Sequence, residues 1–459
     1  MVGHITAAPN DVQFLVSAFC YVGSVFEPTI SSQQFRDAVF SEACGLLTSN
    51  VFTVQGLLTL SIAALGERTL NLSDVLMDRA IQMALDLGMH LRNFADTESD
   101  ATVAESYRRT YWALYVHDCI RTARMARSTF RLSGVAATTD IPCEEWEYQS
   151  GRIPRPVTLL EYDNRDPVEE PDFSSWAYMI ELCRIVGEVY LPLKLRPDSW
   201  VEESNRAEMR IMNWLLRIPK WKNNIVGSSG HPDWVIHMAI GLAHTIRLRL
   251  KWPTERSRLR LRDGFCMGPL ERPEAPPPRD PNLPWDFCPP ELQATNALCD
   301  LIARSPVATM PWSPVNIAAL DRIATGLLDA CVFLSCDTYA TREKLSLVFA
   351  ILKRHSGVWP LAREIASSVK LVARTYLQAT PQNEQRVGVG GSTAGRTDGT
   401  TGGSATMQPT GVASTTWPLV MSSPDLVVTP APVVSMGGNI FSHITAADVP
   451  GFEDWLVGD

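Results

Sequence analysis

The sequence has few of the features that mark a reaction centre or a nucleic-acid-binding surface. Its 459 residues contain ten cysteines but no Cys-x-x-Cys pair, and the nearest two, Cys331 and Cys336, have four residues between them. This spacing fits neither a zinc finger nor a disulfide framework. The net charge of −9 also argues against a nucleic-acid-binding body, which needs an excess of Lys and Arg. Cys44, Cys119 and Cys183 lie in apolar helical patterns, which indicates reduced, buried thiols.

Signals for secretion and for membrane insertion are also missing. The N-terminus has no Lys or Arg before its first apolar run, so it does not resemble a signal peptide. The charge-free stretch 45–66 carries seven Ser, Thr, Asn and Gln residues, which is too polar for a membrane span. We therefore expect no membrane partner.

The apparent motifs for catalysis and for cofactor binding lack the spacing or the sequence context that each chemistry needs. The segment "GGSTAGRT" (390–397) resembles a phosphate-binding loop with Arg396 in place of lysine, but its flanking sequences are not expected to supply the strand before it and the helix after it that such a loop needs. His231, His237 and His244 are spaced by six and seven residues, whereas metal-binding helices place ligands at i and i+4. No Gly-x-Ser-x-Gly nucleophile motif is present. We expect no catalytic, metal-binding or cofactor-binding residue in this chain and no enzymatic activity.

What the chain has in abundance is helical periodicity. Apolar residues recur at steps of three and four, and no segment of the first 145 residues alternates like a strand. We predict an all-α fold: a helical domain over residues 1–378, with loops at about 146–175 and 263–290. The second loop holds nine prolines. Ser73 is expected to cap a helix that ends near Gly88.

The segment "YRRTYWALYVHDC" (107–119) combines aromatic and charged residues. Asp118 falls within an apolar stripe, where a lone carboxylate would cost several kcal/mol, about 3–5 for a broken buried pair. Its partner is expected to be Arg121, at i+3, or an arginine of another helix. His117 points roughly 100° away from Asp118 on a helix, so the two cannot act together as acid and base. We interpret Asp118 as half of a structural ion pair.

A basic segment, "RLRLKWPTERSRLRLR" (247–262), has two interpretations. It is either a contact to phosphate groups or a nuclear-import signal, or it is a solvated helix end followed by a charged loop. Under the first interpretation, the residues expected to contact phosphate groups or an import receptor are Arg247, Arg249, Lys251, Arg258 and Arg260.

The C-terminal composition differs from that of the helical domain. Residues 379–437 are rich in Gly, Ser, Thr and Pro, which predicts a disordered linker. Residues 438–459 interleave acidic residues with large apolar ones, a composition typical of an activation segment that binds a coactivator groove. Its expected anchors are Phe441, Phe452, Trp455 and Leu456. The alternative is a tail helix that packs on its own domain.

Several of these features together resemble the fungal-specific transcription factor domain, the middle homology region of the binuclear zinc-cluster regulators. The matching residues are Gln55, the helix from Ala80 to His90, the set Glu105, Arg108, Arg109, Trp112, Tyr115 and Asp118, and the turn Asp140–Ile141–Pro142. The resemblance is specific over about 35–145 and looser to about 378. It implies a nuclear regulator of RNA polymerase II transcription, with genes of metabolic or secondary-metabolite pathways as targets. It also implies that the set from Glu105 to Asp118 fixes the register between helices.

The chain departs from the family pattern in lacking the N-terminal cluster of six cysteines, and "MARS" (125–128) replaces a Gly-Arg-Pro-like turn. Zinc and DNA binding are therefore expected only through a missing domain or a partner: either the gene model is truncated or the regulator acts without a cluster. Coactivator machinery and a homodimer or a heterodimer with related regulators are the expected partners. The alternatives are a small-molecule-binding helical enzyme with a pocket near His90 and His117, and a scaffold or dominant-negative partner of full-length regulators.

Overall fold

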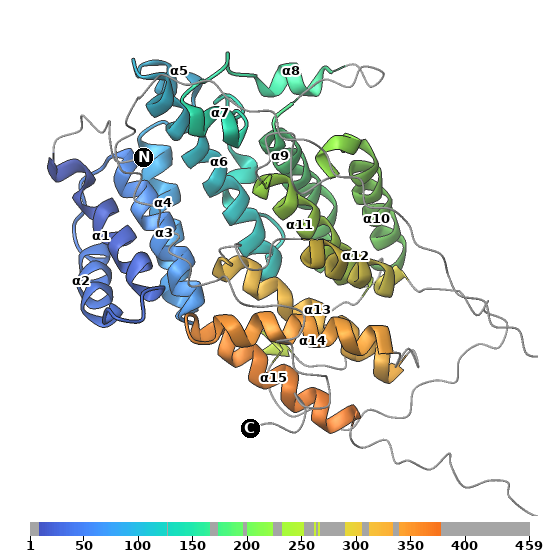
Figure 1. The fold of residues 1–459 in the computed structure, drawn as a ribbon. Helices are drawn as coiled ribbons and strands as arrows, with labels where there is room; N and C mark the ends of the chain where they lie inside the picture. The colour runs from blue at the N-terminus through green and yellow to red at the C-terminus, as the bar shows by residue number, and fades with distance from the viewer. Residues whose placement is uncertain are drawn as a thin grey trace, which may run out of the picture. The chain divides into compact units, whose positions relative to one another are not determined.

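Helices form nearly all of the regular structure, as the sequence predicts, and Figure 1 shows their arrangement. The structure, a computed structural model, describes residues 9–125, 127–165, 173–195, 200–223, 232–251, 261–262, 265–266, 290–304, 312–333 and 339–377. Within these ranges the paired strands are β1 (Leu261–Arg262) and β2 (Phe265–Cys266), a two-residue antiparallel ladder. One isolated bridge joins Ile141 to Val157.

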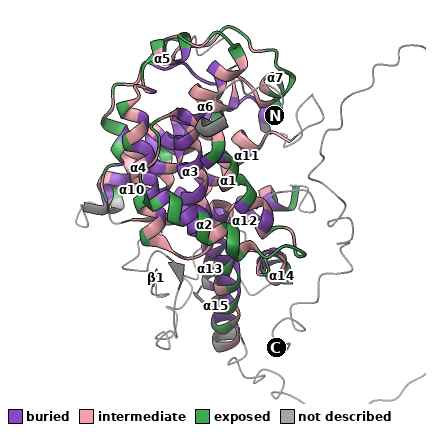
Figure 2. Cartoon of the chain, turned by 90° about the vertical axis from the view of Figure 1, so that its left-hand side faces the viewer, coloured by how far each residue is buried: buried purple, intermediate pink, exposed green. Residues whose placement is uncertain are grey.

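The N-terminal helices pack around α3. The elements are α1 (Pro9–Val25), α2 (Ser32–Cys44), α3 (Val51–Gly66) and α4 (Leu70–Asp86). Buried residues dominate α3 in Figure 2, whereas α2 and the segments around α5 (Arg92–Asp96) and α7 (Glu145–Ser150) carry many exposed ones. Because α3 is apolar on all sides, it must be covered all round, and α1, α4, α13 (Pro314–Phe333) and α15 (Pro360–Leu377) contact it.

Helix termini follow local capping chemistry, with one correction. The side chain of Asn50 accepts a hydrogen bond from the Thr53 N–H at the start of α3. The expected cap Ser73 instead lies one turn inside α4, which begins at Leu70. Its hydroxyl donates to the Ser61 carbonyl (2.7 Å), and the Ser61 hydroxyl donates to the Ser73 carbonyl (2.8 Å). Ser73 therefore joins two closely packed helices. Gly88 does have the left-handed conformation expected after the helix, with φ +81°.

The middle of the chain contains short helices where a loop was expected. Helix α6 (Ala101–Arg124) is capped by Asp100, and η1 (Arg131–Gly134) follows it. Helices α7 and α8 (Leu159–Asp163) lie within or at the edge of the predicted loop 146–175. Both begin with a capping box, Glu144 with Glu147 and Thr158 with Glu161, which satisfies the exposed N–H groups of a short helix.

The second half is built from longer helices. They are α9 (Ser175–Ile185), which continues as a π-helical turn η2 (Val186–Tyr190) and a 3₁₀ turn η3 (Leu191–Leu195), then α10 (Trp200–Arg217), η5 (Lys220–Asn223), α11 (Trp234–Lys251), α12 (Pro290–Arg304), α13, α14 (Tyr339–His355) and α15. Among the cysteines expected to be buried, Cys119 and Cys183 are buried but Cys44, the last residue of α2, is exposed.

Part of the sequence lies outside the described residues. This part includes most of the predicted loop 263–290, the predicted linker 379–437 and the predicted activation segment 438–459 with Phe441, Phe452, Trp455 and Leu456. It also includes Arg258 and Arg260 of the basic segment, His231, and the segment 390–397 with its phosphate-loop resemblance.

The close approach of α3 to the C-terminal helices makes Gly66 sensitive to substitution. A Cβ atom at Gly66 would overlap the Trp359 ring and lie 2.7 Å from Cγ of Pro314. We expect Gly66→Ala to lower the free energy of unfolding by about 1–3 kcal/mol, measured by urea denaturation. The matched control is Gly23→Ala in α1, where a Cβ would meet nothing within 4 Å. A Gly66→Ala protein as stable as the Gly23→Ala protein would contradict this packing.

Candidate functional site

The first turns of α6 carry a buried carboxylate that three donors share. Glu105 is 1% exposed. Its Oε2 accepts from Nε of Arg108 (2.9 Å), and its Oε1 accepts from Nε of Arg109 (3.1 Å) and from the backbone N–H of Cys143 (2.9 Å). Spacings of three and four residues place both arginines on the face of α6 that carries Glu105. The carboxylate thus joins α6 to the segment that leads into α7.

Arg109 extends this connection to α7. Its Nη1 lies 2.6 Å from a carboxylate oxygen of Glu145, and its Nη2 donates to the carbonyls of Cys143 (3.0 Å) and Glu144 (3.1 Å). Its guanidinium lies 4.2 Å from the centre of the Tyr148 ring. Because all of these groups are held by one side chain, the start of α7 is fixed relative to α6.

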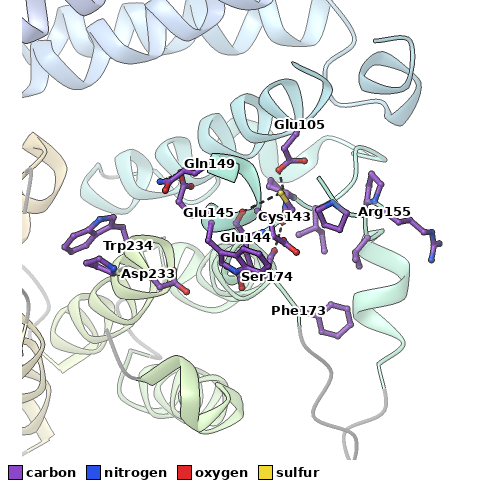
Figure 3. A pocket seen from close by; sticks show the side chains of 18 of the residues that line it. Glu105, Cys143, Glu144, Glu145, Gln149, Arg155, Phe173, Ser174, Asp233 and Trp234 are labelled. Carbon is purple, nitrogen blue, oxygen red and sulfur yellow. Dashed lines mark hydrogen bonds between the residues drawn. The ribbon is translucent and has the colours of Figure 1, made fainter. Parts of the chain in front are cut away.

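A pocket of about 560 Å³ opens beside this network (Figure 3). In Figure 3 Trp234 and Asp233 lie on one side of the pocket and Arg155 on the other, with Glu105 and Cys143 between them. The lining combines acidic with aromatic residues: Glu105, Glu144, Glu145, Glu147, Asp233, Phe173, Trp146, Trp221 and Trp234. The volume is in the range of ligand-binding sites in proteins.

A buried lysine, Lys222, links residues on the side of the pocket that contains Asp233. The Lys222 side chain is 0% exposed, and its ammonium contacts the Glu144 carboxylate, donates to the Ser175 hydroxyl (2.8 Å) and lies 3.9 Å from Asp233. Ser175 donates in turn to Asp233 (2.5 Å). The sequence gives no local signal for this role, because "KWK" contains two lysines and only Lys222 is buried.

The pocket offers binding groups and no activated nucleophile among its described residues. Burial, together with the nearby charge of Glu105, raises the pKa of the Cys143 thiol to about 12, so the thiol stays protonated near neutral pH. Burial also raises the pKa of Glu144, although Lys222 opposes this shift. The carboxylates are already engaged by Arg109, Lys222 and backbone N–H groups. This arrangement suits positioning and binding.

Asp118 lies near the other end of α6, roughly 20 Å along the helix from Glu105. Its side chain is 0% exposed. One carboxylate oxygen lies 3.1 Å from Nη2 of Arg121, one of the two partners that the spacing allowed, and the other accepts from the Leu132 N–H (3.0 Å). Arg121 also contacts Asp78 (2.8 Å). Asp118 therefore ties α6 to η1, and its partner Arg121 ties α6 to α4.

His117 and Asp118 do not converge. His117 lines a separate cavity, which also contains Arg121 and Arg124. Burial lowers the pKa of His117 to about 4, which keeps the imidazole neutral near pH 7. His90 contributes its carbonyl to the N–H groups of Thr138 and Thr139. His117 is not in the lining of the pocket beside Glu105, and His90 is in the lining neither of that pocket nor of the cavity that contains His117.

Aromatic residues of α6 form a packed row with Phe130, which precedes η1. Tyr111, Trp112, Tyr115 and Phe130 pack edge to face, with the centres of successive rings 5.0–5.3 Å apart. The indole N–H of Trp112 donates to the Asp140 carbonyl (2.8 Å), which holds the turn after η1 against α6. The rings fill the core, and the polar atom of Trp112 has the partner that burial requires.

The basic segment lies partly in the interior. Arg247 is 5% exposed and contacts Glu208 (3.2 Å), and Arg249 donates to the Ala123 carbonyl. Both arginines thus make contacts inside the helical domain, which neither interpretation of the sequence had included: one was a contact to phosphate groups or an import signal, and the other was a solvated helix end. Lys251 is the last residue of α11, and nothing further is described of its side chain.

Metal-binding geometry is absent from the described part of the chain, where no group of three His, Cys, Asp or Glu side chains is placed to hold an ion. His237 and His244 lie on α11, and burial lowers the pKa of each to about 4. No described helix is both long and apolar enough to cross a membrane.

Comparison with known proteins gives two kinds of match. Residues 6–226 match the family model of the fungal specific transcription factor domain. The C6 finger domain transcription factor iacK of Pestalotiopsis fici is 27% identical over 273 residues, which cover 55% of this chain and 40% of that protein. An uncharacterized transcriptional regulatory protein of Schizosaccharomyces pombe is 21% identical over 274 residues, which cover 55% of this chain and 43% of that protein. The chain thus spans about two fifths of the length of these relatives. No solved structure matches.

The shared carboxylate predicts a large cost for its removal. Glu105→Ala would leave the buried Arg108 guanidinium without its ion-pair partner, so we expect a loss of about 3–5 kcal/mol in the free energy of unfolding. Asp163→Ala is the matched control, because Asp163 pairs with Arg184 with both side chains about 40% exposed; it should cost less than about 1 kcal/mol. Equal losses of unfolding free energy in the two variants, measured by urea denaturation, would show that the Glu105 network contributes no more to stability than an exposed ion pair does.

Thiol reactivity tests whether the pocket holds a nucleophile. Since a pKa of about 12 leaves almost no thiolate at pH 8, iodoacetamide should alkylate Cys143 at least about a hundredfold more slowly than an ordinary free cysteine. The exposed Cys20 and Cys44 serve as internal references. Site-resolved mass spectrometry over a time course gives the rates. Preferential labelling of Cys143 would instead indicate an activated thiolate.

Proposed function

Because residues 6–226 match the family model of the fungal specific transcription factor domain, we propose that this chain belongs to that family and that it regulates RNA polymerase II transcription in the nucleus. The family match is the observation that carries the proposal, and the two transcription-regulator relatives support it. The helical body is the regulatory part. Genes of metabolic or secondary-metabolite pathways are the targets expected at the level of the family.

Within this function the polar residues of α6 act as a scaffold. Glu105, Arg108 and Arg109 fix α7 against α6, while the pair of Asp118 and Arg121 fixes η1 and α4. Trp112 and Tyr115 fill the space between these points. We propose that the regulatory domain extends from residue 1 to about 378, since α13 and α15 contact α3 and so pack on the part that matches the family model.

The C-terminal segments complete the proposed regulator. Residues 379–437 would act as a linker, and residues 438–459 would bind coactivator machinery through Phe441, Phe452, Trp455 and Leu456. The acidic residues between these anchors keep the aromatic side chains in water until a groove takes them up.

DNA contact would come from outside the residues that this sequence contains. Zinc-cluster regulators use paired cysteines, and this sequence has no Cys-x-x-Cys pair to hold such a cluster. We propose that the chain reaches DNA through a further domain or through a homodimer or heterodimer with a related regulator. The alternative form of this proposal is that the chain acts as a scaffold or as a dominant-negative partner of full-length regulators.

The enzyme alternative receives no support from the described residues. It needed a pocket shared by His90 and His117, and neither of the two cavities described above brings these two histidines together. The acidic pocket beside Glu105 contains a protonated thiol and engaged carboxylates, which suits neither nucleophilic nor general-base catalysis.

A reporter assay tests the activation segment. The full chain and residues 438–459 are each fused to a heterologous DNA-binding domain, and we expect both to activate a reporter at least about tenfold. The control is residues 398–419, a linker segment of the same length without acidic-aromatic pairs. Combined Phe452→Ala and Trp455→Ala substitutions should remove the activation. No activation by either fusion would refute the proposed segment.

A further inference from the structure

The pocket beside Glu105 has exposed indole rings as well as carboxylates in its lining. Trp146 is 51% exposed and Trp221 is 46% exposed, although tryptophan is on average a highly buried residue. Trp234, the first residue of α11, lies beside Asp233 on one side of the pocket (Figure 3). A concave site whose aromatic rings are open to water is typical of a ligand-binding site.

The charges around the pocket determine which kind of ligand it favours. Five carboxylates line it, and among the described residues three cations contact them: Arg108, Arg109 and Lys222. Arg155 also lies in the lining, but it pairs with Glu161, which lies outside the lining (2.7 Å). The segments 166–172 and 224–231, which adjoin the lining along the chain, contain no lysine or arginine. Negative charge is therefore in excess, which favours a cation.

Glu147 carries part of this excess. Arg109 pairs with Glu145, and Lys222 pairs with Glu144. The half-buried carboxylate of Glu147 accepts instead from the uncharged backbone N–H of Glu144 (2.9 Å), the N-cap of α7, and it forms no ion pair with a described cation. A carboxylate in this setting attracts a cation, because Coulomb attraction is stronger beside the protein than in bulk water.

The chain itself shows that residues of this lining can hold an ammonium group. The buried ammonium of Lys222 lies 4.4 Å from the centre of the Trp221 ring and contacts the Glu144 carboxylate. Arg109 likewise lies 4.2 Å from the centre of the Tyr148 ring while it pairs with carboxylates. The attraction between a cation and the face of an aromatic ring is strongest for tryptophan. The exposed parts of the lining offer the same combination of carboxylate and indole to a ligand.

We propose that this pocket binds an organic ammonium ion with an apolar body, with the ammonium beside the carboxylate of Glu147 and the apolar body against the rings of Trp146 and Trp234. A cavity of about 150 Å³ holds one benzene molecule, so a pocket of about 560 Å³ has room for a body of two rings and its ammonium arm. A neutral analogue would make the ring contacts without the charge attraction, and an anion would be repelled by the carboxylates. The pocket therefore selects its ligand by charge.

The ligand would join two parts of the helical domain. Trp146 and Glu147 belong to α7, whereas Trp221 lies in η5 and Trp234 begins α11. A bound ammonium ion would therefore favour the arrangement in which these elements enclose the pocket, by the difference in affinity between arrangements. That this binding serves as an effector signal rests on the proposed function; the binding itself does not.

Binding is tested on the purified full-length chain with three probes that share an indole ring. Tryptamine is the cationic probe, because an alkyl amine, like that of lysine, is protonated near neutral pH. Tryptophol, the corresponding alcohol, is the neutral control, and indole-3-propionate is the anionic control. We expect tryptamine to bind, by calorimetry, at least about tenfold more tightly than either control. Equal binding of tryptamine and tryptophol, or no tryptamine binding at millimolar concentration, would overturn the proposal, and this comparison needs no variant.

The variant Glu147→Gln locates the charge. Glutamine can still complete the capping box of α7, so the helix keeps its N-terminus while the charge is lost. We expect tryptamine to bind at least about fivefold more weakly and tryptophol to bind as it does to the parent chain. The matched control is Glu202→Gln on α10, where the side chain is 83% exposed and lies outside the pocket lining; both affinities should stay unchanged. If Glu147→Gln keeps the preference of the parent chain for tryptamine, the proposed site is wrong.

A pair of variants at Trp146 tests the ring contact. Trp146→Leu removes the aromatic face from a side chain that is half exposed, and it should weaken tryptamine binding at least about fivefold. Trp146→Phe keeps an aromatic face and should retain most of the affinity. Equal tryptamine affinities of the two variants would contradict the proposed placement of the ligand.

The outcomes separate this proposal from the regulator proposal. Calorimetry on the purified chain contains no transcription machinery, so failed binding counts against the ammonium site alone. Absence of reporter activation with intact tryptamine binding counts against the proposed function alone.

Discussion

The arrangement of the helices around α6 depends on one buried carboxylate, Glu105, which requires hydrogen-bond and ion-pair partners. Glu105 is almost fully buried, and leaving its charge without donors would cost several kcal/mol, about 3–5 by comparison with broken buried pairs. Arg108 and Arg109 come from the same helix, whereas the Cys143 N–H comes from 38 residues further along the chain. The hydrogen bond from the Cys143 N–H to Glu105 therefore fixes where the chain returns to α6 after η1 and where α7 begins. The acidic pocket follows from that placement, because Glu144 and Glu145 are carried with Cys143 to its wall.

Helix α6 lies between cavities with different linings. Beside its N-terminal half lies a wide pocket with five carboxylates in its lining, and beside its C-terminal half lie two smaller cavities whose described linings contain Arg121, Arg124 and Arg249 and no carboxylate. The two ion-pair networks, at Glu105 and at Asp118, hold the helix at both ends.

Local patterns explain why much of this could be predicted. Apolar spacing gave the long helices and the all-α class, and the i+3 spacing identified Arg121 as a partner of Asp118. The predictions failed where short capped helices competed with loops: α7 and α8 have too few turns for periodicity to show, although their capping boxes are visible in the sequence. Ser73 was misplaced because Ser is favourable both as a cap and at a close helix contact, and only packing distinguishes the two.

The sequence by itself determined the helical class, the faces that had to be buried and the requirement that Asp118 and Glu105 find partners. These are consequences of residue type and of spacing along one helix. Only the tertiary structure decided which of two neighbouring lysines is buried against Glu144, and that Arg249 meets α6 instead of solvent. Such contacts join residues separated by 78 and 126 positions. Their pairing depends on how whole helices pack, which no local pattern of residues encodes.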